Sequence, residues 1–230
     1  MLSAHLDHIA ICPEVKGDTI CNGAMDNAGD IASMIEVARG FTTLGIQPKR
    51  SILFLAVTAE EKGLVGADYF AQNPTLPKTS LVADVNLDMR IIPYDFSDVV
   101  AFGAERSPIG PAVARAGATI GVRLVPDPAP EQGIFTRSDN YRFVQQDILS
   151  VFLVTGPRGE GAKATAALEK GHCHQPSEDM NLPFVWSAGT KFVALNLAIA
   201  HELGEAPERP DWDRGDFFGT PHHGYGATGE

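Results

Sequence analysis

The stretch RSILFLAVTAEEKGLVG, residues 50–66, contains the change of pattern on which the fold prediction depends. Residues 51–57 form a continuous apolar run, which is typical of a parallel strand buried on both faces of an α/β sheet. The segment that follows, residues 64–72, has a helical pattern that ends before Pro74. Glu60 and Glu61 lie between the two, at the carboxyl end of the strand, where open α/β sheets usually keep their active sites.

The same alternation of strand and helix patterns continues along the chain. Helical spacing of apolar residues predicts helices at residues 26–44, 107–118, 141–146 and 182–203. Short apolar runs predict further strands at residues 82–89, 98–103, 122–125 and 148–154. The polar stretches at residues 12–24 and 155–182 are predicted to be loops. We therefore expect an α/β fold of three layers (α/β/α), in which helices flank a mostly parallel, mixed central sheet.

Length and composition favour one folded domain over residues 1–204. A chain of 230 residues can bury a sizeable core, and 44% hydrophobic with 20% charged residues is ordinary for a soluble globular protein. After Gly204 the composition shifts to Pro, Gly, Asp and Glu, so residues 205–230 are expected to form a loose polar tail. No apolar run reaches the ~20 residues of a membrane span. No basic region followed by an apolar stretch opens the chain, so no signal peptide is expected.

The charge and the cysteines limit the partners and the covalent links. The balance of 18 basic against 29 acidic residues gives a net charge of −11, which argues against nucleic acid or an anionic membrane as the main partner. Bound divalent cations would neutralise part of this acidity. The three cysteines are an odd number, so at least one is unpaired or pairs between molecules. Cys12 and Cys21 flank a short polar loop, and a disulfide and two free thiols are equally compatible with that spacing.

Four other motifs place a histidine or an acid at the end of a strand or the start of a loop or helix. They contain His5 and Asp7 in AHLDH, Asp26 in GAMDNAGD, Asp88 in VNLDM and His174 in GHCHQPSED. Zinc binds imidazole nitrogen and carboxylate oxygen, and its catalytic sites keep one position open for water. A hydrolase with two metal ions needs ligands for each ion, a bridging carboxylate and a separate base. Two histidines, three separated acids and one further acid meet that requirement.

Each motif alone also has a structural interpretation. Glu60 and Glu61 would also suit the first turn of a helix, and Asp26 would suit a helix N-cap. His5 could form a salt bridge with Asp7. Asp88 is harder to explain in this way, because a carboxylate that closes an apolar strand needs a partner or a metal to offset its desolvation. His8 and His172 are reserve candidates for metal ligands. The run from His172 to His174 alone would suit a mononuclear site.

Taken together, the motifs resemble the M28 family of zinc metallopeptidases, which includes bacterial leucyl aminopeptidases and glutamate carboxypeptidases. AHLDH, NGAMDNAG, TAEEKGLVGA, NLDM, RSDNYRF and HQPSED occur in the family's order and at compatible spacings, over roughly residues 3–203. The resemblance implies two zinc ions, with Asp26 as the bridging ligand and the other ligands being His5, Glu61, Asp88 and His174. It also implies that Glu60 is the general base for a metal-bridging water and that Asp7 orients His5.

The chain departs from the family pattern before the AHLDH motif. The family's catalytic domain normally begins well upstream of it, with further strands of the sheet and sometimes an inserted protease-associated domain. The resemblance therefore implies a catalytic domain that lacks its N-terminal portion. Its sheet would have an open edge, which favours self-association. The family is often secreted or periplasmic.

The leading functional hypothesis is a di-zinc exopeptidase, specifically an aminopeptidase that hydrolyses N-terminal residues from peptides. A carboxypeptidase of the same family is the alternative within the family, and it would need several arginines near the metal ions. Only Arg90 and Arg137 are adjacent to the motifs. A cyclase-type relative with one zinc ion is less consistent with a complete ligand set for two. A catalytically silent peptidase-like binding domain is the alternative from another class, although no ligand position is lost.

Overall fold

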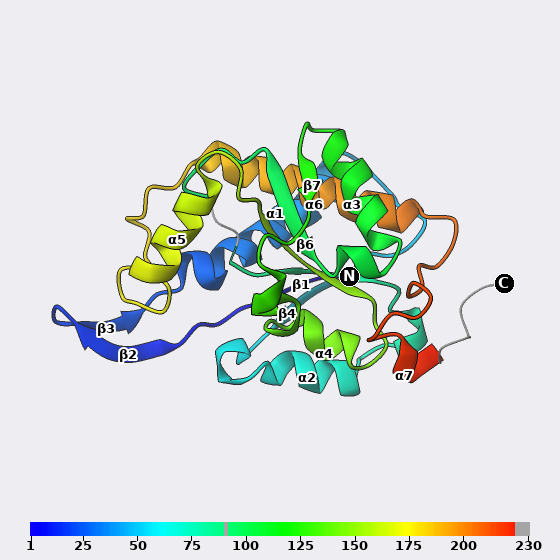
Figure 1. The fold of residues 1–230 in the computed structure, drawn as a ribbon, viewed down its shortest axis with the longest axis horizontal. Coiled ribbons are helices and arrows are strands. Elements are labelled where there is room, and N and C mark those ends of the chain that lie inside the picture. Colours follow the sequence, from blue (N-terminus) through cyan, green and yellow to red (C-terminus); the bar gives the residue numbers. More distant parts are fainter. Residues whose placement is uncertain (90–91, 224–230) are drawn as a thin grey trace.

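The computed structural model describes residues 1–89 and 92–223, and a six-stranded sheet forms its centre (Figure 1). In the order in which they lie side by side, the strands are β4 (Phe54–Val57), β1 (Leu2–His5), β5 (Asp84–Leu87), β8 (Ser150–Thr155), β6 (Asp98–Phe102) and β7 (Arg123–Val125). The first four are mutually parallel, and β6 runs antiparallel to β8. The prediction of a mostly parallel, mixed sheet is confirmed.

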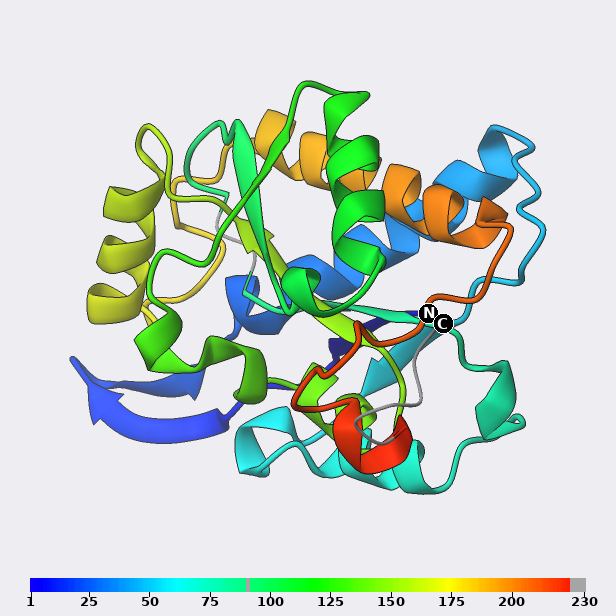
Figure 2. The same ribbon diagram turned by 45° about the vertical axis from the view of Figure 1, so that its right-hand side comes forward.

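Helices cover both faces of this sheet, as predicted (Figures 1 and 2). One face carries α1 (Asp30–Thr43), α3 (Ile109–Ala118) and α6 (Trp186–Glu205), while the other carries α2 (Val65–Gln72) and α4 (Asn140–Val144). Helix α6 packs against both α1 and α3. Its buried residues recur three and four positions apart, which makes one apolar stripe, and they are Phe192, Leu195 and Ile199.

Strand β4 differs from the prediction. The apolar run at residues 51–57 predicts a strand buried on both faces, but the observed strand is shorter and forms the edge of the sheet. Phe54 and Leu55 are only half-buried, and Ala56 is exposed. Strand β4 pairs with β1 on one side, and no strand in the described ranges pairs with its other side. The composition of a strand reflects which faces are apolar and does not report how many of its backbone edges are paired.

Two segments predicted as loops contain regular structure. Residues 12–24 fall largely within a projecting hairpin of β2 (Ala10–Val15) and β3 (Asp18–Cys21) (Figure 1). A disulfide joins Cys12 to Cys21, whereas Cys173 is free. Residues 155–182 contain α5 (Gly161–Gly171), which buries one large apolar side chain, Leu168. Both elements were missed because they bury few side chains and so lack the apolar period by which strands and helices are recognised.

The segment after α6 is packed against the body as far as α7 (Thr220–His223), so the expectation of a loose tail is wrong for residues 206–223. Trp212 is buried, and its indole N–H donates to Oδ1 of Asp147 at 3.1 Å. Asp216 accepts a hydrogen bond from Arg106 at 2.8 Å, and the Phe218 ring lies against the same guanidinium. A tryptophan and an ion pair hold a segment whose composition is polar. Residues 224–230 lie outside the described part.

None of the described helices combines the length and the apolar character needed to cross a bilayer.

The open side of β4 leads to a prediction about self-association. An exposed strand edge is a template for pairing with another chain, and a charged side chain on the edge opposes that pairing. We expect light scattering to show larger species as the concentration of the chain rises, and Ala56→Lys to suppress them. Leu44→Lys is the control. It adds the same charge at an exposed residue that directly follows α1, and it should associate like wild type. A wild-type chain that stays monomeric throughout the series would contradict the prediction.

Candidate metal centre

The histidines and acids singled out by their motifs gather at one edge of the sheet. Strands β4, β1 and β5 are parallel neighbours, so their carboxyl ends meet. His5 is the last residue of β1, Asp88 directly follows β5, and Glu60 and Glu61 open the turn after β4. This is the edge at which open α/β sheets bind their ligands.

Asp26 lies at the centre of the group and has a histidine on each side. Its Oδ1 is 3.1 Å from Nε2 of His5, and its Oδ2 is 3.3 Å from Nε2 of His174. Burial opposes ionisation of this carboxyl, but hydrogen bonds from His174 and His5 hold the pKa of Asp26 well below its usual range. Asp26 is therefore a buried carboxylate shared between two groups of donor atoms.

The first group consists of His5, Asp26 and Asp88, and all three are buried. Besides its contact with Asp26, Nε2 of His5 lies 3.4 Å from Oδ1 of Asp88. The other ring nitrogen, Nδ1, lies 2.7 Å from the carbonyl oxygen of Asp7. A carbonyl can only accept, so Nδ1 carries a proton, and Nε2 is the ring nitrogen that can bind a cation once its own proton has left. Histidines that bind metals usually donate their other N–H in this way.

The second group consists of Asp26, Glu61 and His174, and His8 joins it. Oε1 of Glu61 lies 3.2 Å from Nε2 of His174 and 2.9 Å from Nδ1 of His8. His174 has a positive φ of 58°, which is uncommon outside glycine and turns the backbone sharply at this position. The structure thus brings together all five predicted ligands and adds His8, which the sequence marked only as a reserve candidate.

Asp7 contacts His5 through its main chain, and its side chain acts elsewhere. The carboxylate accepts the N–H of Ala59 at 2.8 Å and the hydroxyl of Thr58 at 2.8 Å. Although burial opposes ionisation, these two donors lower the pKa of Asp7. The predicted orienting contact with His5 is present, but a carbonyl makes it. The carboxylate instead holds the start of the turn that carries Glu60.

Glu60 and Asp139 are acids of this site that belong to neither group. Burial, followed by the charge of Asp88, raises the pKa of Glu60 to about 8. Burial also raises the pKa of Asp139 to about 7. A pKa near the working pH suits a general base. A divalent cation nearby would favour the ionised form of both acids.

The donor atoms of the two groups fit a cation. Within the described ranges, four of the buried atoms that lack a partner in hydrogen-bond geometry belong to the donor residues, namely Nε2 of His5, both ring nitrogens of His8 and Oε1 of Glu61. Buried polar atoms are normally paired. Nitrogen and carboxylate oxygen nevertheless face each other at 2.9–3.4 Å in these groups. Mixed imidazole and carboxylate donors at such separations match the ligand chemistry of zinc.

Ser138 and Glu178 support the donor residues and were not singled out from the sequence. Oγ of Ser138 donates to Oδ2 of Asp88 at 2.5 Å and accepts from Nδ2 of Asn86 at 2.7 Å. Oε1 of Glu178 accepts the N–H groups of Asp26 at 2.7 Å and Met25 at 3.0 Å. Both lie within the motifs RSDNYRF and HQPSED. The motifs contained the signal, but the roles depend on contacts between distant segments.

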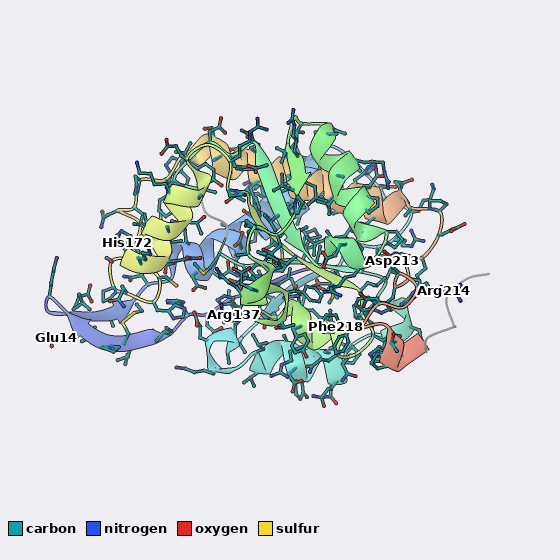
Figure 3. The ribbon with its side chains drawn as sticks, in the orientation of Figure 1. Glu14, Arg137, His172, Asp213, Arg214 and Phe218 are labelled. Atoms are coloured by element: carbon teal, nitrogen blue, oxygen red, sulfur yellow. A yellow bond between two sulfur atoms is a disulfide. The ribbon has the colours of Figure 1, made fainter. Side chains whose placement is uncertain are left out.

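The remaining candidates are placed differently. Sγ of Cys173 lies within 4.8 Å of donor atoms of Asp26 and His174. Burial, with the charge of Asp26, raises the pKa of this thiol to about 12. His172 instead contacts Oγ of Ser177 at 3.0 Å and belongs to no donor group found among the described residues. Arg137 is exposed (Figure 3), and Arg90 lies outside the described residues.

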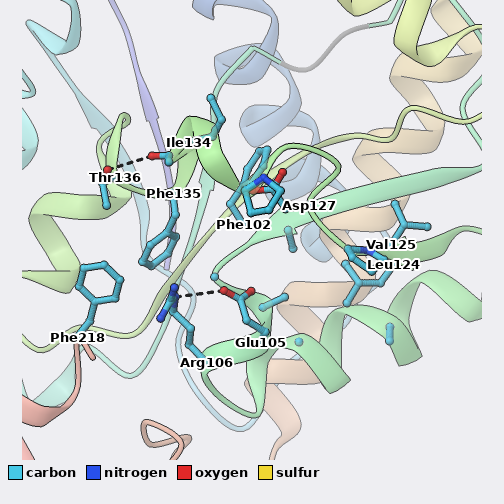
Figure 4. Close-up of a pocket in the computed structure, with 18 of the residues that line it drawn as sticks. Phe102, Glu105, Arg106, Leu124, Val125, Asp127, Ile134, Phe135, Thr136 and Phe218 are labelled. Carbon is cyan, nitrogen blue, oxygen red and sulfur yellow. Dashed lines mark hydrogen bonds and ion pairs between the residues drawn. The ribbon is translucent and has the colours of Figure 1, made fainter. Parts of the chain in front are cut away.

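A cavity of about 780 Å³ lies between α3, the ends of β6 and β7, and residues 126–136 (Figure 4). Phe102, Phe135 and Phe218 contribute to its apolar wall, and the guanidinium of Arg106 lies 5.1 Å from the centre of the Phe135 ring. None of the residues in the two donor groups lines it. The cavity and the candidate metal centre are therefore distinct.

The sequence model of peptidase family M28 matches residues 1–200. The chain belongs to peptidase family M28. This confirms the resemblance indicated by the motifs. Among curated relatives, a "probable zinc metalloprotease" of Pyrenophora tritici-repentis is 42% identical over 67 residues, which cover 29% of this chain and 15% of that protein. Leupeptin-inactivating enzyme 1 of Streptomyces exfoliatus is 31% identical over 90 residues, which cover 39% of this chain and 18% of the enzyme.

Solved structures share the fold. The LapA aminopeptidase of Legionella pneumophila superposes with a TM-score of 0.67 and 24% identity, over 90% of this chain and 50% of LapA. The zinc aminopeptidase BSAP of Bacillus subtilis gives a TM-score of 0.63 and 20% identity, over 87% of this chain and 45% of BSAP. A glutaminyl cyclase of Bacteroides thetaiotaomicron gives a TM-score of 0.63 and 17% identity, over 87% of this chain and 71% of the cyclase. The chain thus spans about half the length of these aminopeptidases and a smaller share of the curated relatives.

The protonation of the histidines leads to a prediction about pH. Burial opposes the imidazolium of His5, but Asp26 and Asp88 raise its pKa to about 12. A hydrogen bond to Asp26 raises the pKa of His174 to about 9. At neutral pH in the ion-free protein, both histidines are therefore in the imidazolium form, with a proton on each ring nitrogen. A bound cation must displace one proton from each ring. We expect apparent zinc affinity to rise from about pH 6 to about pH 9, with proton release on binding.

Calorimetric titrations with zinc in buffers of different ionisation enthalpy measure both the zinc affinity and the number of protons released on binding. Zinc affinity that is independent of pH across this interval, with no proton released, would contradict the assignment of the histidines as donors.

Proposed function

We propose that the chain is a di-zinc exopeptidase, and specifically an aminopeptidase that removes N-terminal residues from peptides. The observation that carries this proposal is the Asp26 carboxylate, whose two oxygens face histidine nitrogens of separate donor groups at 3.1 and 3.3 Å. A hydrolase with two metal ions needs one bridging carboxylate of this kind. His5, Asp26 and Asp88 would hold one ion, and Asp26, Glu61 and His174 the other.

The residues around the ions divide the remaining chemistry. Bound zinc ions supply Lewis acidity at the scissile carbonyl and make water more acidic. Glu60 takes a proton from the attacking water and later passes it to the leaving amine. Asp7 is a positioning residue, because its carbonyl sets the tautomer of His5 and its carboxylate holds the backbone that precedes Glu60.

The charge of the site favours an aminopeptidase over a carboxypeptidase. The side chains that form ion pairs with Asp26, Glu61 and Asp88 are histidines, and within the described ranges no lysine or arginine does so. Recognition of a C-terminal carboxylate relies on cations, above all arginine. Peptides are therefore the proposed substrate, bound through the free amine.

The first test of the function is metal content together with hydrolysis. We expect two zinc ions per chain by elemental analysis after dialysis at neutral pH, and release of the anilide from aminoacyl anilides. N-acetylated anilides, which lack the free amine, are the matched control and should not be hydrolysed. One ion or none would contradict the two-metal centre. Two ions without hydrolysis of any peptide substrate would favour the silent binding domain.

The second test separates the adjacent acids. Glu60→Gln should lower kcat by about 10²–10⁴-fold while leaving two zinc ions bound, because the base is lost and the ligands remain. Glu61→Gln should weaken zinc binding by at least about tenfold, because an amide oxygen is a poorer ligand than a carboxylate. Glu105→Gln, at an exposed acid away from the site, is the control for the change in charge. Equal loss of metal in both site variants would show that the division into base and ligand is wrong.

A further inference from the structure

His8 occupies a position in the second donor group that the proposed ligand set leaves unused. Its side chain is only 6% exposed, although it belongs to neither a strand nor a helix. Nδ1 faces Oε1 of Glu61 at 2.9 Å and Oδ2 of Asp26 at 3.9 Å. Neither ring nitrogen has a partner in hydrogen-bond geometry in the described part of the chain. Burying an imidazole in this way is unfavourable unless something else binds its nitrogen.

The distances among the four donors of this group have the size of a zinc coordination shell. Zinc–nitrogen and zinc–oxygen bonds of about 2.0–2.2 Å in a tetrahedron place neighbouring donors about 3.3–3.6 Å apart. Four of the six separations among these donor atoms are known. They run from His8 to Glu61, from Glu61 to His174, from His174 to Asp26 and from Asp26 to His8, and they are 2.9, 3.2, 3.3 and 3.9 Å. His8 therefore adds a fourth protein donor beside Asp26 and Glu61, whereas the first group has three.

The backbone beside His8 is shaped to hold the ring where it lies. Gly23 has a φ of +64°, and a Cβ atom at this residue would lie 2.7 Å from both Cβ and Cγ of His8. Only glycine leaves room for the imidazole here. The ring of His174 lies across that of His8, with their centres 5.5 Å apart. Two separate segments thus enclose His8 with its Nδ1 directed at the carboxylates.

We propose that His8 is a fourth protein ligand of the ion held by Asp26, Glu61 and His174, so that the two ions are bound unequally. The four-donor ion is bound tightly. The three-donor ion at His5, Asp26 and Asp88 is bound more weakly and keeps the open position that catalytic zinc requires. This inference rests on the two-metal centre proposed above.

The test is a calorimetric zinc titration of the metal-free full chain and three variants. Wild type should bind two ions in two steps whose affinities differ by at least about tenfold. His8→Phe keeps the ring's volume and removes its nitrogen donors, so the tighter step should weaken by at least about tenfold. His8→Asn places an amide oxygen near the position of Nδ1 and should recover part of that loss. His172→Gln, in the loop that leads to His174, is the control and should titrate like wild type.

Cobalt(II) supplies a readout that does not depend on activity. Its visible absorption is more intense in four-coordinate than in five- or six-coordinate sites, so the first equivalent should give the more intense band in wild type and lose it in His8→Phe. Circular dichroism of the metal-free variants establishes that they fold, and His8→Asn carries the test if His8→Phe does not. Two ions bound by His8→Phe with wild-type affinities would overturn this inference and leave the two-metal centre intact. A wild type that binds no zinc would overturn the proposed function itself.

Discussion

The rest of the site depends on the contacts that the Asp26 carboxylate makes with His5 and His174. Asp26 is 3% exposed, it is ionised, and its two oxygens face different histidines. A buried charge of this kind is costly unless it is paired on every side. The chain pairs it with His5 from the first strand of the sheet and His174 from a loop far along the sequence. Glu178 fixes its backbone by accepting two N–H groups.

The parallel sheet explains why distant residues reach one carboxylate. The carboxyl ends of β4, β1 and β5 lie side by side, so the turn after β4, the end of β1 and the end of β5 open at the same edge. Of the five predicted ligands, Asp26 and His174 are the two that neither end nor follow one of these three strands. The same fold occurs in aminopeptidases and in a glutaminyl cyclase. The fold therefore supplies the meeting point, and the donor set decides the chemistry.

The fold class and the predicted donors followed from local patterns, because strand ends and their acids are adjacent in the sequence. Elements that bury few side chains could not be predicted in this way. The β2–β3 hairpin and α5 have little apolar periodicity, and the segment around Trp212 is held by one side chain within a polar composition. The edge position of β4 depends on which strands pair, and this information is not local. The position of His8 beside Glu61 could not be predicted either, because it depends on the packing of Gly23 against the His8 ring.

The claim that Asp26 joins two metal ions is tested most directly by a crystal structure of the zinc-loaded chain, with diffraction data collected on both sides of the zinc absorption edge. Two anomalous peaks are expected, one on each side of the Asp26 carboxylate, with His5 and Asp88 at the first and Glu61 and His174 at the second. A single peak, or two peaks of which neither contacts Asp26, would contradict it.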